Sequence, residues 1–132
     1  MKTIRILILE DDLQTLAEVM NGLFKLEENS IGRKVDFAVT VFSEYTQVED
    51  YLNQIPEPNF DIILLDRDCK LGGSFHAIDI QKFGADRFIS ISSIPKYNET
   101  AAKMGIKRIV HKEYDKLSEF IENLLVEIRE MI

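Results

Sequence analysis

The sequence predicts an α/β fold in which one doubly wound, five-stranded parallel sheet is covered by helices on both faces. Five short apolar runs of strand length alternate with segments whose apolar residues recur every three or four positions. The runs are nearly continuous in apolar residues, which is typical of parallel strands buried on both faces. Strict alternation of strands and helices with right-handed crossovers produces such a sheet with five helices.

The first predicted strand covers residues 3–9 and ends at an acidic edge. It is rich in Ile and Leu, and Glu10, Asp11 and Asp12 follow it directly. Asp12 is a suitable N-cap for a helix over about residues 13–28. The apolar residues that recur along this helix are Leu16, Ala17, Met20, Leu23 and Phe24.

The middle of the chain repeats the alternation of strand and helix. A strand near residues 35–42 precedes a helix near residues 44–52. Two prolines then interrupt the helical pattern, and an apolar strand over residues 61–65 follows. That strand ends at Asp66, so an acidic residue again terminates a buried strand.

The third repeat begins after a glycine pair at residues 72–73. The pattern predicts a helix around residues 75–83 and a strand over residues 87–91. This strand ends at Ser92 and Ser93, so hydroxyl groups stand where the earlier strands carry carboxylates.

The last repeat ends the pattern with a basic residue. A short helix near residues 98–104 has Gly105 as its C-terminal cap, and a strand over residues 108–111 is followed by Lys112. The final helix presents one apolar stripe, which consists of Leu117, Phe120, Ile121, Leu124, Leu125, Ile128 and Ile132.

Length and composition indicate one soluble domain over residues 1–132, with no room for an output domain. Hydrophobic residues make up 45% and charged residues 30% of the 132 residues, a globular balance. With 16 basic and 23 acidic residues the net charge is −7, which disfavours direct binding to nucleic acid or to anionic membranes. No apolar stretch has the length of a membrane span, and we expect a cytoplasmic protein.

Five polar residues are expected to meet at one edge of the sheet, because each follows or ends a strand. They are Glu10, Asp11, Asp66, Ser92 and Lys112. In a doubly wound sheet, ligands bind at the carboxyl ends of the strands. These residues are therefore the first candidates for a functional site.

The segments "ILILEDD", "DIILLD", "ISISS" and "IVHK" resemble, in this order, the landmarks of response-regulator receiver domains, and the resemblance spans essentially the whole chain. It implies a flavodoxin-like sheet with strand order 2-1-3-4-5. It also implies two-component signalling, in which a sensor histidine kinase or phosphotransfer protein donates a phosphoryl group. Such a module is not a turnover enzyme, and its output is a changed affinity for a downstream protein target.

Carried over position by position, the resemblance assigns a role to each residue of the edge. Glu10 and Asp11 match the acidic metal-binding pair, and Asp66 matches the phosphoacceptor. Ser92 matches the switch hydroxyl, and Lys112 matches the lysine that contacts the phosphoryl group.

A divalent cation is expected beside these carboxylates. Clustered carboxylates repel one another unless a hard cation is present, and Mg²⁺ or Mn²⁺ prefers such oxygen ligands. The expected ligands are Glu10, Asp11, Asp66 and Asp68, the last through its backbone carbonyl.

The expected chemistry is an aspartyl phosphate formed on Asp66, since a carboxylate can act as a nucleophile when charge is offset around it. Lys112 can pair with one phosphate oxygen and Ser92 can donate to another. Ser90, on the same side of the strand, and Ser93, the next residue, stay open as alternative hydroxyls.

Several positions depart from the receiver pattern, among them Ile109, and two other functions stay open. Ile109 stands three residues before the lysine, where the family usually has an aromatic residue. "LLDRD" also resembles haloacid-dehalogenase-like phosphohydrolases, with Asp66 as nucleophile and Asp68 as acid and base. The second alternative is a receiver-like docking module without phosphorylation.

Overall fold

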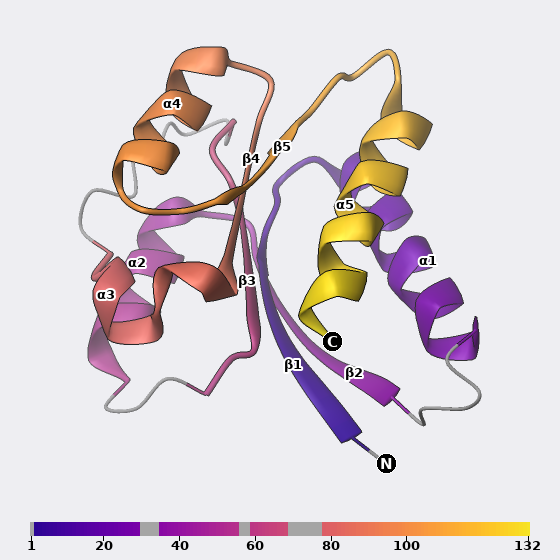
Figure 1. Cartoon of the computed structure of the whole chain (residues 1–132), viewed down its shortest axis with the longest axis horizontal. Coiled ribbons are helices and arrows are strands. Elements are labelled where there is room, and N and C mark those ends of the chain that lie inside the picture. Colours follow the sequence, from indigo (N-terminus) through magenta and orange to yellow (C-terminus); the bar gives the residue numbers. More distant parts are fainter. Residues whose placement is uncertain (1, 30–34, 56–58, 69–77) are drawn as a thin grey trace.

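The computed structural model describes residues 2–29, 35–55, 59–68 and 78–132, which form one sheet with helices on both faces (Figure 1). The strand order is β2-β1-β3-β4-β5, and all neighbouring strands run parallel. The predicted flavodoxin-like order 2-1-3-4-5 is therefore confirmed. The strands are β1 (Lys2–Leu9), β2 (Val35–Phe42), β3 (Ile62–Asp66), β4 (Phe88–Ser92) and β5 (Arg108–His111).

The described residues form five α-helices, which are divided between the two faces of the sheet. α1 (Leu13–Asn29) and α5 (Leu117–Met131) pack on one face. α2 (Tyr45–Gln54), α3 (Ile80–Phe83) and α4 (Pro95–Lys103) pack on the other. Figure 1 shows the two groups on opposite sides of the sheet. None of the helices in the described ranges combines the length and apolarity needed to cross a membrane.

Alternation along β1 builds two separate cores. Its even-numbered residues pack with α1 and α5 in a cluster that includes Ile6, Ile8, Leu23, Phe120 and Leu124. Leu7 and Leu9 point to the other face and pack with α2, α3 and α4 in a cluster that includes Leu52, Phe83 and Ala101. Successive side chains of a strand point to opposite faces, so burial on both faces is confirmed for the second half of β1 and for β3 and β4. The edge strands β2 and β5 are only partly buried.

Capping residues explain where α1 begins and where α4 begins and ends. Thr15 donates from its backbone N–H to the Asp12 carboxylate at 3.0 Å, so Asp12 caps α1 as predicted. α4 begins at Pro95, three residues before the predicted start, because proline fits the first turn of a helix. Gly105 follows α4 with φ +96°, a conformation that favours glycine.

The third predicted helix is described only in its last part. α3 begins at Ile80, after Asp79, whose side chain accepts a hydrogen bond from the Lys82 backbone N–H. A 3₁₀ turn at Ala85–Arg87 joins α3 to β4. Residues 75–77 of the predicted helix and the glycine pair at 72–73 lie outside the described residues.

Candidate functional site

The strand register brings the predicted polar residues to one edge of the sheet. The paired positions nearest that edge are Leu9 with Leu65, Asp66 with Ile91, and Ser92 with His111. Glu10 follows the end of β1 and Lys112 follows the end of β5, so both extend the same row. The carboxyl ends of β1, β3, β4 and β5 therefore contribute to one site.

Lys112 lies at the centre of this site between two carboxylates. Its Nζ atom is 3.0 Å from Asp66 Oδ2 and 3.1 Å from Glu10 Oε1. The three side chains are between 0% and 3% exposed. Buried charges are costly unless they are paired, so this arrangement depends on all three partners.

The pKa values of Glu10 and Lys112 are both shifted by the burial and close packing of these charged groups. Burial, followed by the hydrogen bond and negative charge of Asp66, raises the pKa of Glu10 to about 8. Burial acts to lower the pKa of Lys112, but the charges of Asp66 and Glu10 outweigh it and raise that pKa above its usual value. One ammonium group thus serves two carboxylates, and Glu10 retains a proton well above the pH at which glutamate normally ionises.

Three carboxylates in the described part of the chain could hold a metal ion together. Glu10, Asp11 and Asp66 each offer an oxygen, and these oxygens lie within 4.8 Å of one another. Three carboxylates beside one ammonium group leave negative charge that a divalent cation would balance. The donor set therefore fits Mg²⁺ or Mn²⁺ by its chemistry.

Asp68 does not belong to that acidic group, and its side chain has other partners. Its Oδ1 atom accepts a hydrogen bond from Ser92 Oγ at 2.6 Å, and its Oδ2 atom accepts one from the Ser93 N–H at 2.7 Å. Its own N–H donates to Asp66 Oδ1 at 2.9 Å. The assignment of Asp68 as a metal ligand stays a prediction that concerns its backbone carbonyl.

The three candidate hydroxyls of β4 and its end differ in their surroundings. Ser92 Oγ donates to Asp68 and accepts from the Ile94 N–H at 2.9 Å. Ser90 is fully buried, and its hydroxyl has no hydrogen-bond partner among the described residues. Ser93 reaches Asp68 through its backbone N–H. Both Ser92 and Ser93 therefore contact Asp68 in the loop beside Asp66, and the Ser92 hydroxyl does so at 2.6 Å.

Two aromatic residues that the sequence analysis passed over lie at the site. The Tyr114 ring stands 4.7 Å from Lys112 Nζ, and its hydroxyl is 3.4 Å from Asp68 Oδ2. The guanidinium of Arg67, the residue after Asp66, stacks over the ring of Tyr97 at 5.7 Å. Tyr114 could have been predicted to lie near the site, because it follows Lys112 by two residues. Tyr97 could not, because it lies on α4 and is far from Arg67 in sequence.

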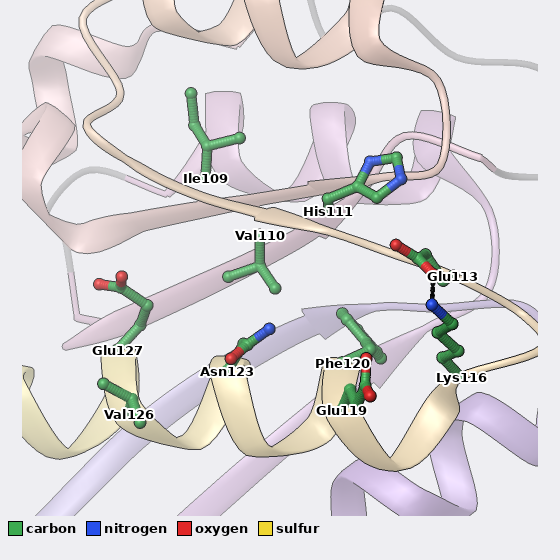
Figure 2. A pocket seen from close by; sticks show the side chains of 10 residues that line it. All are labelled: Ile109, Val110, His111, Glu113, Lys116, Glu119, Phe120, Asn123, Val126 and Glu127. Carbon is green, nitrogen blue, oxygen red and sulfur yellow. Dashed lines mark ion pairs between the residues drawn. The ribbon is translucent and has the colours of Figure 1, made fainter.

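Ile109 and a neighbouring cleft lie apart from the acidic site. Figure 2 shows Ile109 pointing away from α5 while Val110, the next residue, points toward it. Ile109 packs against the core of the α4 face, so an aliphatic side chain fills the position expected to be aromatic. The cleft has a volume of about 340 Å³. It is lined by Ile109, Val110, His111, Glu113, Lys116, Glu119, Phe120, Asn123, Val126 and Glu127.

Comparison with known proteins identifies the fold of the chain. No protein-family model and no curated protein matches the sequence. The structure is similar to HP1043, an orphan response regulator of H. pylori, with a TM-score of 0.63 and 17% identity over 96% of this chain and 97% of that one. It is also similar to the Francisella response regulator 1452 receiver domain, with a TM-score of 0.60 and 16% identity over 98% and 99%.

A third similar structure is the non-phosphorylated HemR receiver domain from Leptospira biflexa. Its TM-score is 0.58, with 22% identity over 95% of this chain and 94% of that one. At these identities the likeness concerns the fold. The chain has the receiver-domain fold along nearly its whole length.

Proposed function

Because the chain has the fold of response-regulator receiver domains, we propose that it is a phosphoacceptor signalling module in which Asp66 takes up a phosphoryl group. The observation that carries this proposal is the placement of Lys112. Its ammonium group is 3.0 Å from Asp66 and 3.1 Å from Glu10, beside the three-carboxylate group that includes Asp11. A nucleophilic carboxylate, a fixed cation and a metal-binding set at one strand edge are the parts that phosphoryl transfer requires.

In the proposed transfer, one carboxylate oxygen of Asp66 attacks phosphorus and an O–P bond forms. The P–N bond to a phosphohistidine of a sensor kinase or phosphotransfer protein breaks, and the imidazole leaves with that electron pair and takes a proton from solvent. Lys112 already touches Asp66 Oδ2, so its ammonium group stands beside the oxygens that acquire charge. Positioning and charge stabilisation are the protein's main contributions.

A divalent cation would be held by Glu10, Asp11 and Asp66, with Asp68 as a further ligand through its backbone carbonyl. When bound, Mg²⁺ or Mn²⁺ supplies positive charge that offsets the phosphoryl oxygens. Before that, the proton on Glu10 must leave, because only a deprotonated carboxylate is a good metal ligand. Because the pKa of Glu10 is raised, binding of a cation at neutral pH would release a proton.

The proposed output is a change in affinity for a downstream protein. Ser92 ends β4 and Lys112 follows β5, and the Lys112 N–H donates to the Ser92 carbonyl at 3.0 Å. A phosphoryl group that draws both side chains would therefore act on two adjacent strands and on α4, which begins at Pro95. Partner contacts on that side of the molecule are the expected readout.

A docking module without phosphorylation is the second candidate, because Asp66 is only 1% exposed and a phosphodonor must displace neighbouring groups to reach it. The phosphohydrolase has less support. Burial acts to raise the pKa of Asp68, but hydrogen bonds from Ser92 and Ser93 and the charge of Lys112 outweigh it and lower that pKa. A general acid near neutral pH needs a raised pKa.

The test is the intact mass of the protein after incubation with Mg²⁺ and acetyl phosphate or phosphoramidate. We expect one phosphoryl adduct that requires Mg²⁺ and is lost in Asp66→Asn. Asp61→Asn is the matched control, since Asp61 lies just before β3 and accepts a hydrogen bond from the Arg5 N–H.

An adduct that survives in Asp66→Asn contradicts the assignment. No adduct from small donors or from a phosphorylated kinase would favour the docking module, and steady release of phosphate from small phosphomonoesters would favour the phosphohydrolase.

A further inference from the structure

The carboxylate of Asp68 fills a set of hydrogen-bond donors that stand next to the phosphoacceptor. Ser92 Oγ and the Ser93 N–H donate to its two oxygens at 2.6 and 2.7 Å, and the Tyr114 hydroxyl lies 3.4 Å from Oδ2. The first two distances are in the range of charge-assisted hydrogen bonds. The Asp68 carboxylate of the chain itself is therefore the anion that these donors bind at the ends of β4 and β5.

These donors are of the kind that bind a phosphoryl group. A hydroxyl, a backbone N–H and a nearby ammonium group are donors that suit a compact oxyanion. Lys112 contributes to the same field, since its charge is one of the causes that lower the pKa of Asp68. The Asp68 N–H donates a hydrogen bond to Asp66 Oδ1 at 2.9 Å. The Asp68 carboxylate and the proposed nucleophile therefore belong to one hydrogen-bond network.

We propose that Asp68 is an internal stand-in for the phosphoryl group, which occupies the Ser92 and Ser93 donors until a phosphoryl group on Asp66 displaces it. This inference rests on the proposed function of Asp66. The unmodified chain then holds its Ser92 hydroxyl in a bound position, and modification exchanges one anion for another. Asp68 is in this sense a positioning residue that competes with the phosphoryl group for the same donors.

Two consequences distinguish this role from that of a carboxylate that merely stabilises a loop. Removal of the Asp68 carboxylate should free the Ser93 N–H in the unmodified protein, and a phosphoryl group should then bind that N–H again. Removal should also speed the uptake of phosphoryl groups from an anionic small donor, because the donors are vacant and a repelling charge is gone. If Asp68 only stabilises a loop, the Ser93 N–H should lose protection when the carboxylate is removed, and a phosphoryl group should not restore that protection.

Amide hydrogen exchange at Ser93, measured by NMR, tests the exchange of anions directly. The proteins are wild type, Asp68→Ala and the charge control Glu113→Gln, each with and without Mg²⁺ and beryllofluoride, a mimic of the phosphoryl group. Glu113 is a partly exposed neighbour of Lys112 whose ion-pair partner is Lys116 at 3.7 Å. The dispersion of the spectra confirms that each variant is folded.

Without the mimic, we expect the Ser93 amide to exchange at least about tenfold faster in Asp68→Ala than in wild type or Glu113→Gln, because a charge-assisted hydrogen bond is lost. With the mimic, protection should return in Asp68→Ala and stay unchanged in wild type. Equal protection in all three proteins before the mimic is added overturns the inference.

The failure of the inference can be told apart from the failure of the proposed function. If the mimic shifts the resonances around Asp66 but leaves Ser93 unprotected in Asp68→Ala, the stand-in role is wrong while the phosphoacceptor site remains. If the mimic shifts no resonance around Asp66 in any of the proteins, the proposed function is wrong and the stand-in role falls with it.

Discussion

Lys112 Nζ lies 3.1 Å from Glu10 Oε1, although the two residues are 102 positions apart in the sequence. The contact is buried, and it joins the end of the first strand to the end of the last. Asp66, from the middle strand, completes it. The charge balance of the site thus depends on three distant parts of the chain.

Replacement of Lys112 by Met should destabilise the protein by about 3–5 kcal/mol at pH 8, because it leaves buried carboxylates without their cation. Urea denaturation of the metal-free protein measures this loss. Arg108→Met is the matched control, since Arg108 pairs with Glu127 and Glu130 at the surface and such pairs contribute about 1 kcal/mol or less. Similar losses in the two variants would contradict the view that Lys112 is a buried structural cation.

The metal-free protein should lose stability as the pH rises toward 8. The pKa of Glu10 is about 8 in the folded protein, whereas that of an unperturbed glutamate, as in the unfolded chain, is 4.5. Folding therefore favours the protonated form. This contribution to stability is complete below pH 4.5 and is lost as the pH passes through about 8. Urea denaturation across this range should show a slope that Glu10→Gln reduces. Parallel curves for wild type and Glu10→Gln would show that Glu10 is not the group responsible.

If Glu10, Asp11 and Asp66 hold Mg²⁺ as proposed, the ion should stabilise the folded protein, because the unfolded chain does not bring these carboxylates together. At one hundred times the dissociation constant the gain is about 2.7 kcal/mol. Thermal denaturation with increasing Mg²⁺ measures it, and Asp11→Asn should remove most of the gain. An equal gain in Asp11→Asn would place the ion elsewhere.

Two serines of β4 should respond differently to the loss of their hydroxyls. Ser92→Ala should cost about 1–3 kcal/mol, because it leaves the hydrogen bonds of Asp68 and of the Ile94 N–H unmade. Ser90→Ala should be close to neutral or stabilising, since the buried Ser90 hydroxyl has no hydrogen-bond partner among the described residues. Chemical denaturation of the two variants gives both values. A greater loss in Ser90→Ala would reverse this assignment.

The apolar stripe of α5 should behave as core. Leu124 is 0% exposed and packs against β1 and α1, so Leu124→Ala should cost about 2–5 kcal/mol. Val126, two residues later, is 48% exposed, and Val126→Ala should change stability by about 0.5 kcal/mol or less. Urea denaturation compares them, and equal effects would mean that α5 is not packed as described.

The sheet and the site edge were predictable because they depend on strong local signals. Continuous apolar runs mark strands buried on both faces, and the polar residue that ends each run marks the edge. Glu10, Asp66 and Lys112 were therefore placed together without any knowledge of the strand register. The start of α4 at Pro95 was missed because the periodic pattern becomes clear only from Asn98 onward.

The partners of Asp68 could not be predicted in the same way. Its bond to Ser92 depends on the path of the chain after β3 and on the side chain's rotamer, and neither leaves a periodic signal in the sequence. The stacking of Arg67 on Tyr97 likewise joins two elements that share no pattern. Loop geometry, and not strand or helix propensity, determines these contacts.

The place of Lys112 directly after β5 has a consequence during synthesis of the protein. A nascent chain that still lacks β5 has no ammonium group near Glu10 and Asp66, so the two carboxylates must stay hydrated or carry protons. Docking of the last strand and completion of the reactive site are then one event. On the proposed function, a ribosome-bound chain with four strands in place lacks the ammonium group beside Asp66 and should not accept a phosphoryl group before β5 has docked.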